Sequence, residues 1–149
     1  METDDNQNLT EQLLNQINNA DSIENYIEDN EGNFWNPSLT EYLEALLKKY
    51  KVKKSEIFQR AGLVGNNYGY EIFNGAKKQP SRDILIQICI AFPLSVEEAQ
   101  QVLRKAGKAI LYPRDKRDAF ILFALKRQMT LDELNDKLFE NGIEGLGLE

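Results

Sequence analysis

The chain has 149 residues, of which 42% are hydrophobic and 28% are charged, and its net charge is −6. These values are ordinary for a globular protein, and the length suits one domain or one domain with an appendage. Cys89 is the only cysteine, which excludes an intrachain disulfide and a zinc site built from several cysteines.

The sequence contains no histidine, which removes the commonest general base and the commonest metal ligand. No pair of carboxylates is marked out for catalysis, so we expect no enzymatic activity, no metal and no cofactor. The acidic, polar start METDDNQN does not look like a signal peptide, and the longest apolar stretch, ILIQICIAFPL, is too short to span a bilayer. We therefore expect a cytoplasmic protein that does not enter a membrane.

Charge is unevenly distributed along the chain. Residues 1–37 contain nine acidic residues and no basic one, residues 38–112 contain twelve basic and seven acidic ones, and residues 113–149 contain six basic and eight acidic ones. We interpret these segments as an acidic helical arm, a central body, and a C-terminal helical pair packed on the body. Such asymmetry is typical of a nucleic-acid-binding surface beside an acidic arm; an arm that only aids solubility is the alternative.

Helical periodicity and N-cap signals run through most of the chain, and no segment shows the sustained alternation of a strand. In the arm, Asp21 and Glu24 have the spacing of a capping box. The first helix of the body is predicted after Ser38, and the second runs through KKSEIFQRAG to Gly62. The third covers NYGYEIFN and ends at Gly75, because glycine suits the backbone of a helix stop.

Four more helices are predicted beyond the third. Ser81 precedes the strongly apolar RDILIQICIAF, in which Cys89 is expected to be a small core residue. Ser95 caps the next helix, another spans roughly residues 114–127, and Thr130 caps the last one. The predicted fold class is therefore all-α. The apolar side chains of the last helix are Leu131, Leu134, Leu138 and Phe139.

Five helices of this order and length, over about residues 38–106, resemble the lambda-repressor-like (Xre/Cro-type) helix-turn-helix family. The most specific part is the third helix followed by NG, a basic pair and PS. The whole chain also resembles small Firmicutes-type Xre regulators with YGYxIFxG, PSRD and a following LYPRxxRDA segment. The resemblance implies a five-helix body with helical extensions, in a DNA-binding transcriptional regulator that forms a homodimer.

The chain departs from this family where the second and third helices touch. The family usually places a small Ala on the second helix against a bulky residue on the third, whereas this chain has Phe58 and Gly69 there. We expect the Phe58 ring to fill the space that Gly69 leaves, because paired volume exchanges are tolerated in cores. Leu63 is expected to fill the space beneath the turn.

The resemblance places the start of the third helix against base edges in the major groove. The residues there are Asn66, Asn67 and Tyr70, with Glu71 nearby. Asn reads adenine through two hydrogen bonds, Glu accepts from cytosine, and Tyr contacts a thymine methyl group or a phosphate. Helix capping is the alternative for the two asparagines.

Phosphate contacts are expected on both sides of that helix. Lys53 and Lys54 start the second helix, and Lys77, Lys78 and Arg82 follow the third. Such contacts give affinity and register but carry no sequence information. A solvated turn is the alternative for Lys77 and Lys78. Because the third helix itself contains no Lys or Arg, a helical adaptor that uses the same frame to bind a protein is the second hypothesis.

Three roles are open for the acidic arm. An anionic arm folded over the basic body would compete with DNA. The arm would otherwise dock a protein partner or a second copy through Leu13, Leu14 and Ile17, or pack elsewhere for stability. The expected partners are therefore double-stranded DNA, a protein bound by the arm, and a second copy of the chain.

Overall fold

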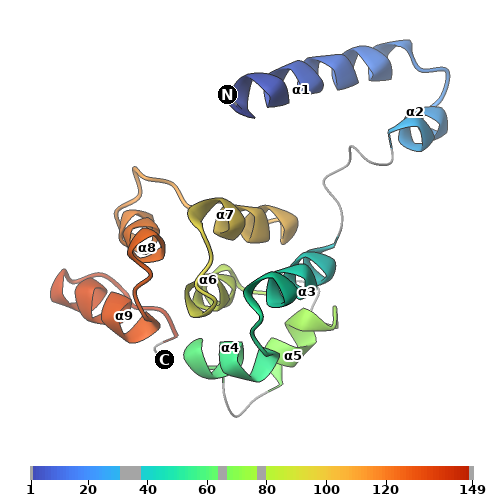
Figure 1. The fold of residues 1–149 in the computed structure, drawn as a ribbon. Coiled ribbons are helices and arrows are strands. Elements are labelled where there is room, and N and C mark those ends of the chain that lie inside the picture. Colours follow the sequence, from blue (N-terminus) through green and yellow to red (C-terminus); the bar gives the residue numbers. More distant parts are fainter. Residues whose placement is uncertain (1, 31–37, 64–66, 77–79, 148–149) are drawn as a thin grey trace. The chain divides into compact units, whose positions relative to one another are not determined.

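The computed structural model describes residues 2–30, 38–63, 67–76 and 80–147 (Figure 1). Every regular element in these ranges is an α-helix, so the predicted all-α class is confirmed for them. Within the same ranges, no helix combines the length and the apolar character needed to cross a membrane. The helices are α1 (Glu2–Asn19), α2 (Ile23–Asp29), α3 (Leu39–Tyr50), α4 (Lys54–Arg60), α5 (Tyr68–Phe73), α6 (Arg82–Ala91), α7 (Val96–Lys105), α8 (Lys116–Arg127) and α9 (Leu131–Glu140).

The chain divides into two compact units, Met1–Trp35 and Asn36–Glu149. The first unit contains α1 and α2. The Ser22 hydroxyl accepts a hydrogen bond from the Asn25 amide at 3.1 Å and so caps α2. The capping box predicted to start at Asp21 is therefore wrong by one residue.

The first unit leaves most of its described apolar side chains exposed. Tyr26 is buried, and the Asn30 side-chain amide donates to its carbonyl at 3.0 Å. Among the residues whose burial is described, packing of α1 against α2 therefore covers little apolar surface. The large exposed hydrophobic residues are Leu14, Ile17, Ile23 and Ile27.

α6 forms the centre of the second unit, and every residue from Leu85 to Ala91 is buried. α4, α7, α8 and α9 all pack on α6, while α3 packs on α5 and α7 (Figure 1). Cys89 lies in this core as predicted, and burial raises the pKa of its thiol.

Side-chain caps start most helices of the second unit, as the sequence predicts. Such caps each stabilise a helix by about 1 kcal/mol, because they satisfy a backbone amide that has no partner within the helix. The capping box is complete in α7 and α9. Asp115 caps α8, which begins at Lys116, two residues later than predicted. The hydroxyls that cap the other four helices are those of Ser38, Ser81, Ser95 and Thr130.

α9 buries Leu134 and Leu138 but leaves Phe139 82% exposed. The four apolar side chains of this helix therefore do not share one buried side. At 100° per residue Phe139 lies about 140° around the helix from Leu134, which turns it away from the buried side. Beyond α9 the chain folds back, and Leu146 is buried.

A mostly buried carboxylate links α3 to α7. Glu98, in the first turn of α7, accepts hydrogen bonds from Lys49 Nζ at 2.7 Å and from the Tyr50 hydroxyl. It also accepts from the Ser95 amide at 3.0 Å. Burial alone would raise the pKa of Glu98, but these hydrogen bonds outweigh it and lower the pKa to about 2. Burial and the adjacent Glu98 carboxylate raise the pKa of Tyr50 to about 12. The contact therefore depends on an ionised Glu98.

We predict that Glu98→Gln lowers the free energy of unfolding by about 2 kcal/mol at neutral pH, because a neutral amide loses the charge-assisted hydrogen bonds from Lys49 and Tyr50. The folded pKa of Glu98 is depressed, so its stabilising contribution is full above the ordinary value of 4.5 and is lost as the pH falls toward about 2. Urea unfolding measured across this window should show the difference between wild type and E98Q shrinking as the pH falls.

Glu97→Gln is the matched control, because Glu97 is an exposed neighbour in the same helical turn. This variant should change stability by less than about 0.5 kcal/mol. A difference between wild type and E98Q that stays constant down to about pH 2 would contradict the role assigned to the carboxylate.

Candidate nucleic-acid interface

The α4–α5 pair has a buried side and an outward side. Gly62 ends α4 with a φ of +74°, and Leu63 is buried just after it, as predicted. α5 buries Ile72 and Phe73, and Gly75 follows it with a φ of +82°. Both helix stops predicted from glycine are therefore confirmed.

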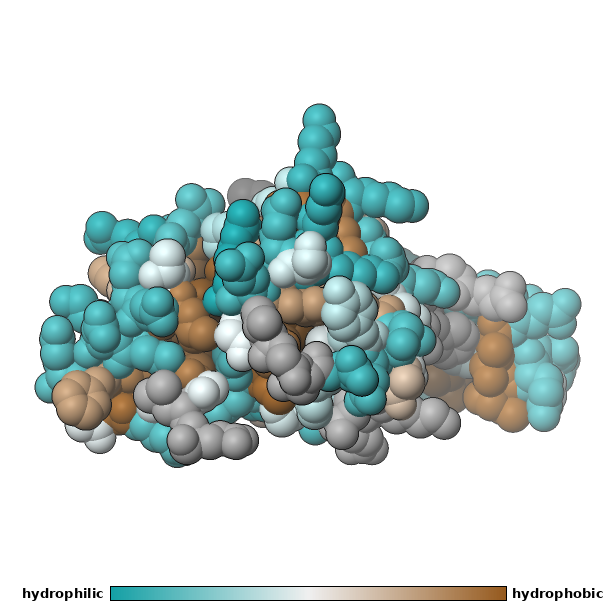
Figure 2. Space-filling model, turned by 90° about the horizontal axis from the view of Figure 1, so that it is seen from below, coloured by the Kyte–Doolittle hydropathy of each residue, from teal (hydrophilic) through white to brown (hydrophobic). Residues whose placement is uncertain are grey.

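The outward side of α5 is polar. Asn67, Tyr70 and Asn74 are exposed, and Glu71 is partly exposed. The Asn67 side chain makes no capping hydrogen bond, so the capping alternative fails for this residue. Seen from below, the side of the molecule on which α4 and α5 lie is mostly hydrophilic, with hydrophobic side chains visible in gaps (Figure 2). Such a surface suits a polar partner.

The predicted packing of Phe58 against Gly69 is confirmed. A Cβ atom built on Gly69 would lie 2.6 Å from Phe58 Cδ1, which is closer than van der Waals contact allows. The Phe58 ring meets the rings of Tyr70 and Phe73 edge to face, with centroids 4.6 and 5.4 Å away. Phe58 thus supports Tyr70, whose ring is half exposed on the outward side of α5.

The two predicted cations of α4 lie in different surroundings. Lys53 is exposed at the N-cap position of α4. Lys54 forms an ion pair with Glu44 of α3 at 2.7 Å, and its Nζ lies 5.9 Å from the centroid of the Phe73 ring. Lys54 therefore lies close to α5, as a phosphate contact on that side requires.

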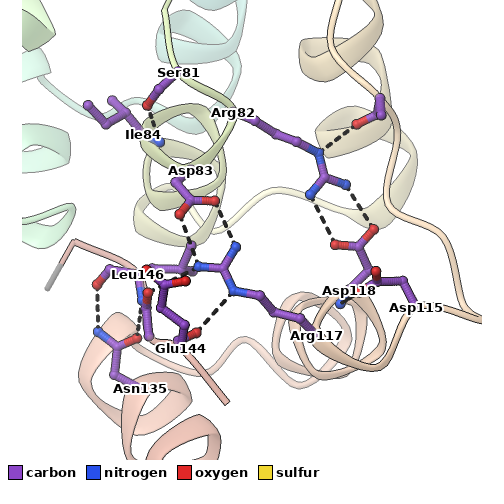
Figure 3. Close-up of polar contacts among 12 residues, drawn as sticks. Ser81, Arg82, Asp83, Ile84, Asp115, Arg117, Asp118, Asn135, Glu144 and Leu146 are labelled. Carbon is purple, nitrogen blue, oxygen red and sulfur yellow. Dashed lines mark hydrogen bonds and ion pairs between the residues drawn. The ribbon is translucent and has the colours of Figure 1, made fainter.

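Arg82 has a structural role at the start of α6. Its guanidinium donates to both carboxylate oxygens of Asp118, at 2.8 and 3.1 Å (Figure 3). It also donates to the carbonyls of Ala109 and Ile110. Its side chain is 25% exposed. The Nε, Nη1 and Nη2 groups of Arg82 thus all donate to acceptors within the protein. Arg82 therefore contributes to the candidate interface only through the position of α6.

A second pair runs in the opposite direction beside the first. Arg117 of α8 donates to both carboxylate oxygens of Asp83 of α6, at 2.8 and 3.0 Å (Figure 3). These hydrogen bonds raise the pKa of the Arg117 guanidinium. The sequence contains a signal for this arrangement, because RD occurs at 82–83 and again at 117–118, each time in the first turn of a helix. Sequence reasoning did not connect the two dipeptides.

The predicted site residues are only partly brought together. Lys54 lies near α5, which carries Tyr70 and Glu71, while Arg82 is used between α6 and α8. Asn66, Lys77 and Lys78 lie outside the described residues. No family model, no curated protein and no solved structure matches this chain.

We predict that Gly69→Ala has opposite effects in two backgrounds. In the wild type it should lower the free energy of unfolding by about 1 kcal/mol or more, because overpacking against Phe58 outweighs the better helix propensity of Ala. In a Phe58→Leu background the clash is absent, and the same change should stabilise by up to about 1 kcal/mol. Urea unfolding of the four proteins gives the coupling energy. Equal effects of Gly69→Ala in both backgrounds would contradict the packing.

Proposed function

We propose that this chain is a non-enzymatic DNA-binding regulator of Xre type, in which residues 38–106 form the helix-turn-helix body and α5 reads double-stranded DNA. The observation that carries the proposal is the outward side of α5, where Asn67, Tyr70 and Asn74 are exposed while Ile72 and Phe73 are buried. A helix with one buried side and one side of amide and hydroxyl groups suits the major groove, whose base edges present donors and acceptors. A cytoplasmic location and a homodimer belong to the same proposal.

The side chains of α5 have distinct roles in this proposal. The Asn67 amide reads adenine through two hydrogen bonds, which its freedom from capping allows. Tyr70 presents a ring held by Phe58, suited to a thymine methyl group. Glu71 is negative and partly exposed, so it faces a cytosine amino group rather than a phosphate.

The phosphate contacts come from lysines outside α5. The Lys53 side chain is exposed, so it can contact a phosphate without breaking an ion pair. The Lys54–Glu44 pair is itself about 40% exposed on both sides, and such exposed pairs stabilise by at most about 1 kcal/mol, so exchanging Glu44 for a phosphate costs little. Lys77 and Lys78, which follow α5 in the sequence and lie outside the described residues, are the further phosphate contacts of this proposal.

A helical adaptor is the second candidate, because a different surface favours it. An apolar groove of about 360 Å³ lies between α8 and α9, and Phe123 at its edge is 53% exposed. The exposed apolar residues of α1 and α2 give the acidic arm a surface of the same kind. Exposed apolar surface is typical of a protein-binding site. The groove is lined by Ala119, Phe120, Phe123, Met129, Leu134 and Lys137.

A salt titration with a mixed-sequence DNA duplex tests the proposed function. We predict that log K falls linearly with log salt concentration, with a slope of about −0.9 for each phosphate neutralised. Lys53→Glu should weaken binding and make the slope shallower by about 0.9 or more, because one phosphate contact is lost. Fluorescence anisotropy of a labelled duplex measures both quantities.

Lys126→Glu is the matched control, because Lys126 is an exposed lysine on α8, which carries none of the proposed DNA contacts. It changes net charge by the same amount and should leave the slope nearly unchanged. Equal losses in K53E and K126E would show attraction by net charge only and would contradict the proposed interface. A wild-type protein that does not bind the duplex at low salt would favour the adaptor.

A further inference from the structure

The segment that follows α9 is fastened to the second unit by hydrogen bonds to its backbone; residues 143–147 are called the tail strap below. The Asn135 side-chain amide donates to the Leu146 carbonyl at 2.9 Å and accepts from the Leu146 amide at 2.8 Å (Figure 3). The Leu146 side chain is buried in the core. A segment held in this way has a defined path rather than a frayed one.

Arg117 fixes the middle of the tail strap. Its guanidinium donates to the carbonyls of Glu144 and Gly145, each at 3.0 Å, while it also pairs with Asp83 of α6 (Figure 3). One arginine therefore joins α8, α6 and the tail strap. The path of the strap is set by the same pairs that join α6 to α8.

The end of the tail strap lies against a buried amide. A Cβ atom built on Gly147 would lie 2.7 Å from Gln87 Nε2, so an alanine there would require the Gln87 side chain or the strap to shift. Gln87 lies on α6 and is 3% exposed. The strap thus limits the positions that the Gln87 side chain can take.

Gln87 connects this contact to the candidate interface. Its Nε2 donates to the Ala61 carbonyl at 2.8 Å. Ala61 is the C-cap residue of α4 and precedes Gly62, from which the chain leads to α5. Gln87, Gly62 and Gly147 also line one open cleft of about 740 Å³. The Gln87 amide therefore bridges the tail strap and the end of α4.

We propose that the tail strap fixes the backbone at the end of α4, residues 61–63, by holding the Gln87 amide on the Ala61 carbonyl. Gln87 is a positioning residue in this mechanism, because it acts through this backbone. The consequence for DNA rests on the function proposed above. The effect on the backbone at the end of α4 does not rest on that function, and it can be measured on the protein without DNA.

Two glycine variants provide a matched test. Gly147 and Gly142 have nearly equal φ values of +71° and +67°, so alanine brings similar backbone strain at both. A Cβ on Gly142 meets nothing within 4 Å, whereas a Cβ on Gly147 meets the Gln87 amide. Only Gly147→Ala must therefore move the strap or the amide.

The readout is amide hydrogen exchange resolved by NMR. Two amides lie next to the Ala61 carbonyl. The Gly62 amide belongs to the same peptide group, and the Leu63 amide donates to the Phe58 carbonyl at 2.8 Å. We predict that Gly147→Ala speeds exchange of these two amides about tenfold, the factor for one hydrogen bond lost, and that Gly142→Ala changes it little. Gln87→Met, which keeps the volume and removes the donor, should reproduce the effect of Gly147→Ala.

Three outcomes would overturn the proposal. In the first, exchange of the Gly62 amide is unchanged in both Gly147→Ala and Gln87→Met. In the second, Gly142→Ala has the same effect as Gly147→Ala. In the third, hydrogen exchange of the Phe92 amide, which donates to the Ile88 carbonyl of α6, speeds up equally, so that the effect is global.

DNA titrations separate this proposal from the proposed function. If the wild type binds the mixed-sequence duplex, Gly147→Ala should weaken binding more than Gly142→Ala. If the wild type does not bind, the proposed function fails, while the exchange measurement still decides whether the strap acts on the end of α4. Binding that is lost equally in both glycine variants would contradict the strap's effect on DNA.

Discussion

Two arginine–aspartate pairs that cross between α6 and α8 hold the second unit together on one side of its core. Asp118 is 7% exposed in its side chain, and a buried carboxylate without partners would be strongly destabilising. It is satisfied by two hydrogen bonds from Arg82 and by one from the Tyr112 amide. The reverse pair, Arg117 with Asp83, carries the tail strap as well. This crossed arrangement therefore joins α6 to α8, and through Arg117 it also holds the strap.

The same arrangement bears on the proposed DNA interface. Because the Arg82 guanidinium is hydrogen-bonded between α6 and α8, the proposal assigns phosphate contacts to Lys53 and Lys54 and to the lysines after α5. It assigns base reading to α5, which has no basic residue and whose Tyr70 ring is supported by Phe58. In the proposed function, affinity and specificity would therefore come from different elements.

Local signals account for what the sequence predicts well. The caps at Ser95 and Thr130 and the stop at Gly75 depend on residues within one helical turn, so spacing alone identifies them. The Phe58–Gly69 contact joins neighbouring helices, and the exchange of a small and a bulky residue relative to the family pattern predicts it.

Pairings between distant parts of the chain explain what the sequence does not reveal. Arg82 and Asp118 are 36 residues apart, and Lys49 and Glu98 are 49 apart, so no local spacing relates them. Surface arginines and lysines are read by default as available for ligands. Whether a charged side chain is already paired within the protein depends on tertiary contacts, so the sequence alone predicts a phosphate contact for Arg82.

Arg82 is hydrogen-bonded within the protein, so the proposed function does not count it among the DNA contacts. NMR of the arginine side chains during addition of duplex DNA tests this assignment most directly. The Arg82 Nε–H donates to the Ala109 carbonyl at 2.9 Å, so its resonance should exchange slowly with water and stay in place, while the Tyr70 amide shifts. An Arg82 resonance that exchanges rapidly before DNA is added, or moves in step with Tyr70, would contradict the account.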